Sequence, residues 1–253
     1  MNSIIVIPVR MNSTRFPGKP LCKIAGNEMV NRIFDLCMNS NKTSQVYVAT
    51  CDQDIKECVE NYGGNVVMTS DLHERATDRV AEAVTILEKK NDIRYSSVVM
   101  VQGDEPLVNS EDIDLSIQEL EENSEVDICN IMCQIDNYHD FSSNNVVKVA
   151  TDNNNFALLM SRSAIPYIKK DEYMSQGLKQ TGVIGFKRDA LDLFFELSET
   201  SIEKIESIDM MRMLQHGRKI KMILSKDNYI AVDVIEDLDK VKKYLECNLY
   251  EKN

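Results

Sequence analysis

The sequence predicts an α/β fold built on a mostly parallel sheet. Short apolar runs rich in β-branched residues alternate with segments of helical periodicity through the first half of the 253-residue chain. Strand and helix in alternation imply right-handed crossovers, with helices covering both faces of the sheet. The second half is less regular and contains a candidate hairpin. We therefore predict a single domain over residues 1–253 with a small inserted layer at about residues 140–215.

In the first half, residues typical of turns and helix caps separate the predicted strands from the predicted helices. Asp52 and Asn109 stand at helix N-cap positions, Asp112 completes a pattern that resembles a capping box, and Gly63 with Gly64 is a stop signal. The predicted strands are Ser3–Pro8, Gln45–Thr50, Asn65–Met68, Ser97–Gln102 and Asp127–Cys133. The predicted helices are Met29–Ser40, Asp52–Tyr62, Ala76–Lys90 and Ser110–Asn123.

The second half is predicted from shorter patterns. The strands Val146–Thr151 and Phe156–Met160 flank the polar turn at residues 152–155, which favours a hairpin. Further strands are predicted at Gly182–Phe186, Ile220–Leu224 and Tyr229–Val232. Helices are predicted at Arg188–Leu197, around Ser207–His216, and from Ile235 to the end of the chain.

Composition and charge exclude several classes of protein. A formal net charge of -12 argues against binding to a nucleic-acid backbone or to an anionic membrane surface. The sequence has no apolar run of about 18 residues, and seven cysteines scattered without CxxC spacing predict reduced thiols. We expect a cytoplasmic protein that binds neither nucleic acid nor membrane, and that concentrates cations locally around any anionic ligand.

The segment PVRMNSTRFPGKP, residues 8–20, is such a local concentration of cations. It follows the first predicted strand, and its prolines and glycine restrict the backbone between Arg10, Arg15 and Lys19. Forked guanidinium groups and main-chain amides in such a loop suit a polyphosphate, although a solvated basic loop has the same composition. The segment is not a Walker A loop, because Lys19 is followed by Pro20 rather than Ser or Thr.

Two aspartates follow apolar strands of the predicted sheet. Asp104 lies in the turn Gly-Asp-Glu-Pro after the strand that ends near Gln102, and Asp233 follows the predicted strand Tyr229–Val232. Ligands of open α/β sheets bind at the carboxyl ends of the strands. Two carboxylates at that edge are compatible with Mg²⁺, although an aspartate in such a turn also has ordinary structural uses.

The sequence resembles the CMP-Kdo synthetase (3-deoxy-manno-octulosonate cytidylyltransferase) family of nucleotidyltransferases. The resemblance rests on collinear motifs that span nearly the whole chain: the RxxSTRxPGKP loop, YVAT at residues 47–50, VVMT at 66–69, VQGDEP at 101–106, SRSAIP at 161–166, and VD followed by EDL at 232–238. It implies a Rossmann-like sheet with a small dimerisation and substrate layer. It also implies a homodimer that uses CTP and Mg²⁺.

The resemblance also implies roles for individual residues. Arg10, Arg15 and Lys19 would contact the nucleotide and its phosphates together with the loop residues Pro8 and Ser13, and Gln102 would lie near the nucleoside. Asp104 and Asp233 would hold the metal, while Arg79 and Arg162 match arginines that line the nucleotide and acid site. The expected reaction is in-line displacement at the α-phosphorus of CTP by an oxygen of an acidic acceptor, with pyrophosphate as the leaving group. Arg10, Lys19, Asp104 and Asp233 would carry the catalysis.

Departures from the family pattern concentrate where the acceptor is expected to bind. The family's SGTER segment is RATDR here, which introduces Arg75 beside Arg79. We expect Arg75 at the nucleotide site, and as an extra cation it would also suit a phosphonate or phosphate acceptor. The family's RHLGIYGY run is KQTGVIGF at residues 179–186, with Gln180 and Ile184 in place of a histidine and a tyrosine, and a Glu-Gln pair becomes Asp209-Met210. Three hypotheses follow: a cytidylyltransferase for Kdo or a Kdo-like acid, the same chemistry on a small phosphonate or phosphate, or an inactive nucleotide-binding homologue.

Overall fold

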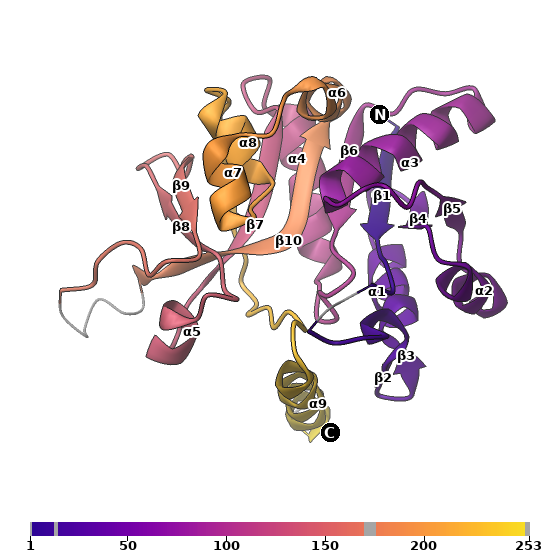
Figure 1. Cartoon of the computed structure of the whole chain (residues 1–253), viewed down its shortest axis with the longest axis horizontal. Coiled ribbons are helices and arrows are strands. Elements are labelled where there is room, and N and C mark those ends of the chain that lie inside the picture. Colours follow the sequence, from indigo (N-terminus) through magenta and orange to yellow (C-terminus); the bar gives the residue numbers. More distant parts are fainter. Residues whose placement is uncertain (1, 13–14, 170–175, 251–253) are drawn as a thin grey trace.

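A nine-stranded sheet forms the centre of the molecule in the computed structural model, which describes residues 2–12, 15–169 and 176–250 (Figure 1). The order of its main path is β11-β7-β10-β6-β1-β4-β5, and β8 pairs with β10 and β9. Strands β6, β1, β4 and β5 are parallel to one another, as are β7 and β11, whereas β10 runs antiparallel between β6 and β7. The predicted α/β fold with a mostly parallel sheet is therefore confirmed.

The elements of the first half follow the predicted alternation. They are β1 (Ser3–Pro8), the 3-10 helix η1 (Lys19–Leu21), β2 (Lys23–Ile24), β3 (Asn27–Glu28), α1 (Met29–Met38), β4 (Val46–Thr50), α2 (Gln53–Tyr62), β5 (Val66–Met68), α3 (Ala76–Asn91), β6 (Ser97–Val101) and α4 (Ser110–Glu122). The strands β2 and β3 form a separate two-stranded sheet that the sequence analysis missed.

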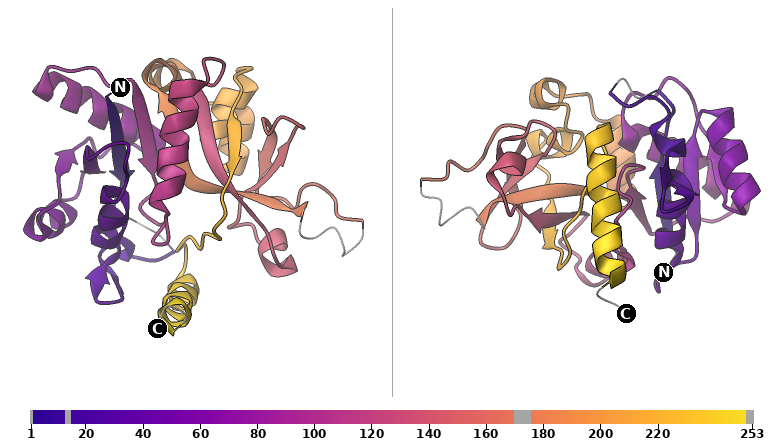
Figure 2. Two further views of the ribbon diagram at one scale, coloured as in Figure 1. Left: turned by 180° about the vertical axis from the view of Figure 1, so that it is seen from behind. Right: turned by 90° about the horizontal axis from the view of Figure 1, so that it is seen from below.

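The elements of the second half complete the sheet and add the hairpin. They are β7 (Ile128–Gln134), α5 (Tyr138–Ser142), β8 (Lys148–Thr151), β9 (Ala157–Ser161), β10 (Leu178–Lys187), α6 (Arg188–Glu196), α7 (Ser201–Glu206), α8 (Met210–Gln215), β11 (Lys221–Leu224) and α9 (Ile235–Tyr250). Figures 1 and 2 show β8, β9 and α5 at one end of the long axis, and α2 with β5 at the other.

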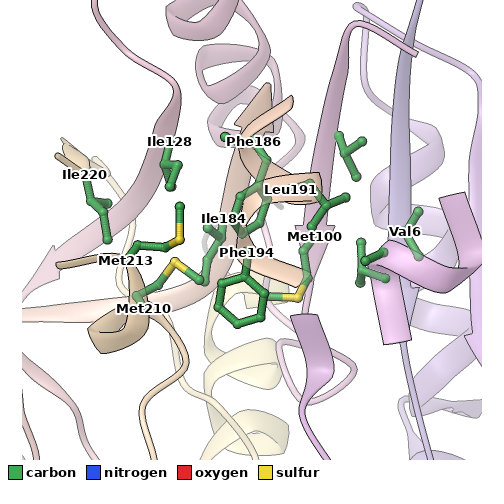
Figure 3. Close-up of a cluster of buried hydrophobic side chains, with 14 of the residues drawn as sticks. Val6, Met100, Ile128, Ile184, Phe186, Leu191, Phe194, Met210, Met213 and Ile220 are labelled. Carbon is green, nitrogen blue, oxygen red and sulfur yellow. The ribbon is translucent and has the colours of Figure 1, made fainter. Parts of the chain in front are cut away.

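The strand β1 shows how the sequence builds two apolar layers. Ile4 and Val6 face one side of the sheet, where they join a core with residues of α3, α6 and α8 (Figure 3). Ile5 and Ile7 face the other side, where residues of α1, α2, α4 and α9 cover them. Because both faces are buried, the strand reads as a continuous apolar run rather than an alternating one. The strand ends at Pro8, and the cationic segment at residues 8–20 begins there.

One predicted element of the second half is wrong. Residues 229–232 form no strand, because this segment makes only isolated contacts, such as the bond from Val232 N–H to the Asp104 carbonyl (2.9 Å). The helix predicted around Ser207–His216 is confirmed as α8, and α7, which the left-handed Ser207 (φ 53°) separates from it, was not predicted. The hairpin Val146–Thr151 with Phe156–Met160 is confirmed as β8 and β9.

The predicted caps are partly confirmed. Asn109 caps α4, since its side chain accepts a hydrogen bond from Glu111 N–H (2.9 Å), and Gly63 ends α2 in the left-handed conformation. Asp52 lies at the N-cap position of α2 but accepts from Met11 N–H instead (2.8 Å). The Asp112 side chain makes no capping box, because it accepts from Ser225 and Tyr229.

The cysteines are reduced, as their spacing predicts. All seven cysteines are free thiols, and Cys37, Cys129 and Cys133 are buried. None of the helices in the described part of the chain combines the length and apolar character that crossing a membrane requires.

Gly185 in β10 provides a test of the packing between the sheet and α4. A Cβ atom at this position would lie 2.7 Å from Cys129 Sγ and 3.0 Å from Leu120 Cδ1, both of which are buried. We expect Gly185→Ala to lower the free energy of unfolding by about 1–3 kcal/mol, as overpacking does. Urea denaturation measures this, and Cys129→Ala in the same chain should recover part of the loss. A double variant as unstable as the sum of the two single variants would contradict this account.

Candidate active site

Two adjoining clefts open where the carboxyl ends of β1 and β6 meet. The smaller cleft, with a volume of about 410 Å³, is lined by the segment after β1 and by the start of α3. The larger cleft, of about 1010 Å³, is lined by β10, by α5 and by the segment before α9. Both clefts share six residues: Arg15, Gln102, Asp104, Ser207, Asp209 and Asp233. A ligand in one cleft and a ligand in the other would therefore meet at the two aspartates.

Main-chain contacts bring Asp104 and Asp233 together. The turn after β6 is fixed by Gln102 N–H, which donates to Gly182 O (2.9 Å), and Val232 N–H then donates to Asp104 O (2.9 Å). Gly103 packs against the end of β1, where a Cβ atom would lie 2.7 Å from Val9 Cγ1 and 3.1 Å from Pro8 O. Only glycine therefore lets this turn lie so close to the segment that follows β1.

The cationic loop reaches both aspartates. Lys19 Nζ donates to Asp104 Oδ2 (3.1 Å) and to the carbonyl of Val232 (2.8 Å). The Arg15 guanidinium donates to Asp233 Oδ1 (2.8 Å), and Arg10 is an exposed residue that lines the smaller cleft. These contacts bring together four of the residues predicted from spacing alone. Ser13 lies outside the described residues.

The electrostatics of this site favour a bound cation. Burial and the neighbouring Asp104 raise the pKa of Asp233, whereas Arg15 and Lys19 lower it. Among the described residues, buried Asp104 Oδ1 has no hydrogen-bond partner. No three His, Cys, Asp or Glu side chains within residues 2–12, 15–169 and 176–250 gather closely enough to hold a metal ion. A metal at the aspartate pair would therefore take its other oxygen ligands from water or from a bound phosphate.

The arginines at the start of α3 have mainly intramolecular partners. Arg79 is buried and donates to Thr69 Oγ1 (2.6 Å) and Ser70 O (3.1 Å), so it shapes the loop at the edge of the smaller cleft. Arg75 donates to Ser207 Oγ (2.9 Å) and lies 3.5 Å from Glu199 and 3.6 Å from Asp209. Its guanidinium is thus neutralised by carboxylates. The idea that Arg75 supplies an extra free cation for a phosphonate acceptor loses its basis.

The residues expected on the acceptor side surround the larger cleft in different ways. Arg162 lines the cleft but donates to the carbonyls of Glu206 (2.7 Å) and Asn144 (2.9 Å). Asp209 accepts from Thr77 Oγ1 (3.0 Å), and burial raises its pKa. Gln180 lines the cleft, and its buried Oε1 has no partner within the described part of the chain.

Two of the expected acceptor residues belong mainly to the core. Ile184 and Met210 are 2% and 1% exposed and pack in the same apolar cluster as Phe186 and Met213 (Figure 3). They line the larger cleft as well, so they contribute apolar wall rather than hydrogen bonds.

The sequence analysis missed Glu105, Asn145 and Lys179. Glu105 is buried, accepts from Gly182 N–H (2.6 Å), and has its pKa raised to about 7 by burial and by Asp104. Asn145 Oδ1 accepts from Arg15 (2.7 Å), and Lys179 Nζ donates to Tyr229 O (2.7 Å). Glu105 lies inside the Gly-Asp-Glu-Pro turn that was singled out for Asp104, which is the one sequence signal for this group.

Comparison with known proteins agrees with this geometry. Residues 4–220 match a family model described as cytidylyltransferase, the class that the fold and site define. Relatives described as 3-deoxy-manno-octulosonate cytidylyltransferase include those of Geobacter sulfurreducens, 38% identical over 97% of this chain and 100% of the relative, and of Fusobacterium nucleatum, 36% identical over 98% of both chains. The chain therefore belongs to the cytidylyltransferase family and, within it, to the 3-deoxy-manno-octulosonate cytidylyltransferases.

Solved structures show the same fold. A CMP:2-keto-3-deoxy-manno-octonic acid synthetase complexed with CTP superimposes with a TM-score of 0.86 at 28% identity, covering 98% of this chain and 100% of the other. A cytidylyltransferase from Leptospira borgpetersenii shares the fold alone, with a TM-score of 0.64 and 17% identity over 97% of this chain and 87% of the other. The chain is thus a CTP-dependent nucleotidyltransferase, and the hypothesis of an inactive homologue is set aside.

We expect Arg75 to stabilise the fold around the site rather than to bind a ligand. Arg75→Ala would remove the ion pair of Asp209 (3.6 Å), whereas the buried Glu203 would keep its pair with Arg212 (2.7 Å), so we expect the free energy of unfolding to fall by roughly 1–3 kcal/mol. Chemical denaturation measures this effect. Arg94→Ala is the matched control, because Arg94 pairs with Asp189 and Asp192 at the exposed surface and its loss should cost much less. Equal losses in the two variants would contradict a structural role for Arg75.

Proposed function

We propose that this protein transfers CMP from CTP to 3-deoxy-manno-octulosonate (Kdo) and releases pyrophosphate. The observation that carries the proposal is the pairing of Lys19 and Arg15 with Asp104 and Asp233 at the edge shared by the two clefts. This arrangement offers cations to a triphosphate and carboxylates to a metal at the same point. The full-length similarity to proteins described as 3-deoxy-manno-octulosonate cytidylyltransferases supports Kdo as the acceptor.

The smaller cleft is the proposed site of CTP. Arg10, Arg15 and Lys19 neutralise the phosphate charge as the pyrophosphate leaves, which is the main contribution that a protein makes to phosphoryl transfer. Gln102 lies at the boundary of the two clefts and is assigned to the nucleoside, together with Pro8 and Ser13 of the loop. Arg75 and Arg79 border this cleft, but their contacts assign them to its shape.

The aspartate pair is the proposed site of Mg²⁺. Asp104 and Asp233 offer hard carboxylate oxygens, and the unpartnered Oδ1 of Asp104 is an available ligand among the described residues. When bound, Mg²⁺ would neutralise phosphate charge and polarise the phosphoryl group. Lys19 and Arg15 already contact these carboxylates, so they hold both side chains at the cleft boundary.

The acceptor oxygen attacks the α-phosphorus directly in this scheme, and the bond from that phosphorus to the pyrophosphate oxygen breaks. No covalent enzyme intermediate is needed. Burial raises the pKa of Cys129 and Cys133 to about 12, so these thiols stay protonated and unreactive. The larger cleft would receive the acid, with Arg162, Lys179 and Gln180 on its wall.

The assembly and location of the enzyme complete the proposal. A homodimer is supported by the exposed apolar side chains Leu158 and Leu159 of β9 and Ile205 of α7, which are 65%, 37% and 82% exposed. The region around residues 140–215 would form the acceptor and dimerisation layer of a single domain. A cytoplasmic location stays a prediction of the sequence.

Removal of one aspartate tests the metal site. We expect Asp104→Asn to lower kcat at least about 100-fold with little change in thermal stability, because charge stabilisation at the phosphates is lost. Pyrophosphate release with CTP, Mg²⁺ and Kdo measures kcat. Asp127→Asn, a surface carboxylate paired with Lys187, is the control and should remain active. Near-normal turnover by Asp104→Asn would disprove the assignment.

Metal removal and a panel of acceptors test the reaction itself. Chelation with EDTA should abolish pyrophosphate release, and excess Mg²⁺ should restore it. With metal present, we expect turnover with Kdo or its 8-amino analogue and none with small phosphonates. The analogue is included because Gln180 Oε1 and Asp209 are hydrogen-bond acceptors at the larger cleft. Turnover confined to phosphonates would refute the proposed acceptor.

A further inference from the structure

Lys148 is a fully buried lysine at the start of β8 that the reaction scheme does not use. Its ammonium donates to three main-chain carbonyls, those of Ser143 (2.8 Å), Val146 (2.7 Å) and Arg162. An ammonium has three hydrogens, so its donor capacity is filled. Lys148 therefore ties the segment before β8 to the segment after β9.

The segment that Lys148 holds, residues 143–146, points toward the cationic loop. Asn144 O accepts from the Arg162 guanidinium (2.9 Å), and Asn145 Oδ1 accepts from Arg15 (2.7 Å). Arg15 donates through its other terminal nitrogen to Asp233 (2.8 Å). The Arg15 side chain is thus held between Asn145, just before β8, and Asp233.

We propose that Lys148 is a positioning residue for the CTP triphosphate, because it fixes the 143–146 segment so that Asn145 orients Arg15 at the boundary of the two clefts. The inference rests on the proposed function, in which Arg15 binds phosphate. The Arg15 side chain is 49% exposed, so without Asn145 only its contact with Asp233 would restrict its rotamers. Binding a phosphate would then include the entropic cost of ordering it.

The charges around Lys148 are consistent with a tethering ammonium. Burial and, after it, the charge of Arg162 lower its pKa to about 8, with Glu206 opposing the shift, so the charged form predominates at neutral pH. Glu206 itself accepts from Ser161 Oγ (2.6 Å) and Arg162 N–H (2.9 Å) rather than from Lys148. The three carbonyls are the direct partners, and their removal from water is compensated by this one group.

Two variants and their combination test the inference on the wild-type background. We expect Asn145→Ala to raise the KM for CTP about threefold to tenfold with little change in kcat or in the KM for Kdo, because only the ordering of Arg15 is lost. Lys148→Met should raise the KM for CTP by a similar factor. The double variant should be no worse than the more affected single variant, since both changes act through the same contact.

Controls separate positioning from general stability and from the reaction itself. Lys187→Met is the control, because Lys187, the last residue of β10, also donates to main-chain carbonyls, those of Asn123 and Ser124. This variant should leave the KM for CTP unchanged. An unchanged KM in Asn145→Ala would overturn the inference even if Lys148→Met failed to fold, and so would multiplicative effects in the double variant. Absence of wild-type turnover with CTP and Kdo would instead count against the proposed function, and direct titration of CTP would still compare the variants.

Discussion

The structure of the site depends on the contact that holds two carboxylates side by side. The Val232 amide donates to the carbonyl of Asp104, and Lys19 contacts both the Asp104 carboxylate and the Val232 carbonyl. Burial and, after it, repulsion by the like charge of Asp104 raise the pKa of Asp233. One lysine and one main-chain bond therefore hold together two segments that lie far apart in the sequence, and both segments line the two clefts.

The antiparallel strand β10 forms one wall of the larger cleft. This strand lies antiparallel between β6 and β7, and residues on both sides of its register shift between Gln180 and Ile184 line the larger cleft. Gly182 lies within this irregular stretch, where its carbonyl accepts from Gln102 and its amide donates to Glu105. The turn that carries Asp104 and the strand that borders the acceptor cleft are thus one packed unit.

The sequence predicted those parts of the fold that are governed by local patterns. The buried parallel strands and their helices were recovered because apolar runs and caps such as Asn109 act within a few residues. The segment 229–232 was apolar enough to resemble a strand, but its partners are a carbonyl in one turn and a lysine in β10. Arg75 was assigned to the nucleotide because spacing cannot reveal its neighbours Glu199, which precedes α7, and Glu203, which lies in α7.

The cations proposed to bind the triphosphate, Arg15 and Lys19, each pair with a carboxylate of the same site, and this pairing holds them in place. The net charge of -12 gives no long-range attraction to CTP, so affinity must come from a few groups held in place before the ligand arrives. Arg15 and Lys19 are held by Asp233 and Asp104, the same residues that suit Mg²⁺. A metal held by Asp104 and Asp233 would leave Arg15 and Lys19 free to contact the phosphates of the nucleotide. Metal and triphosphate are therefore expected to bind cooperatively at this edge of the sheet.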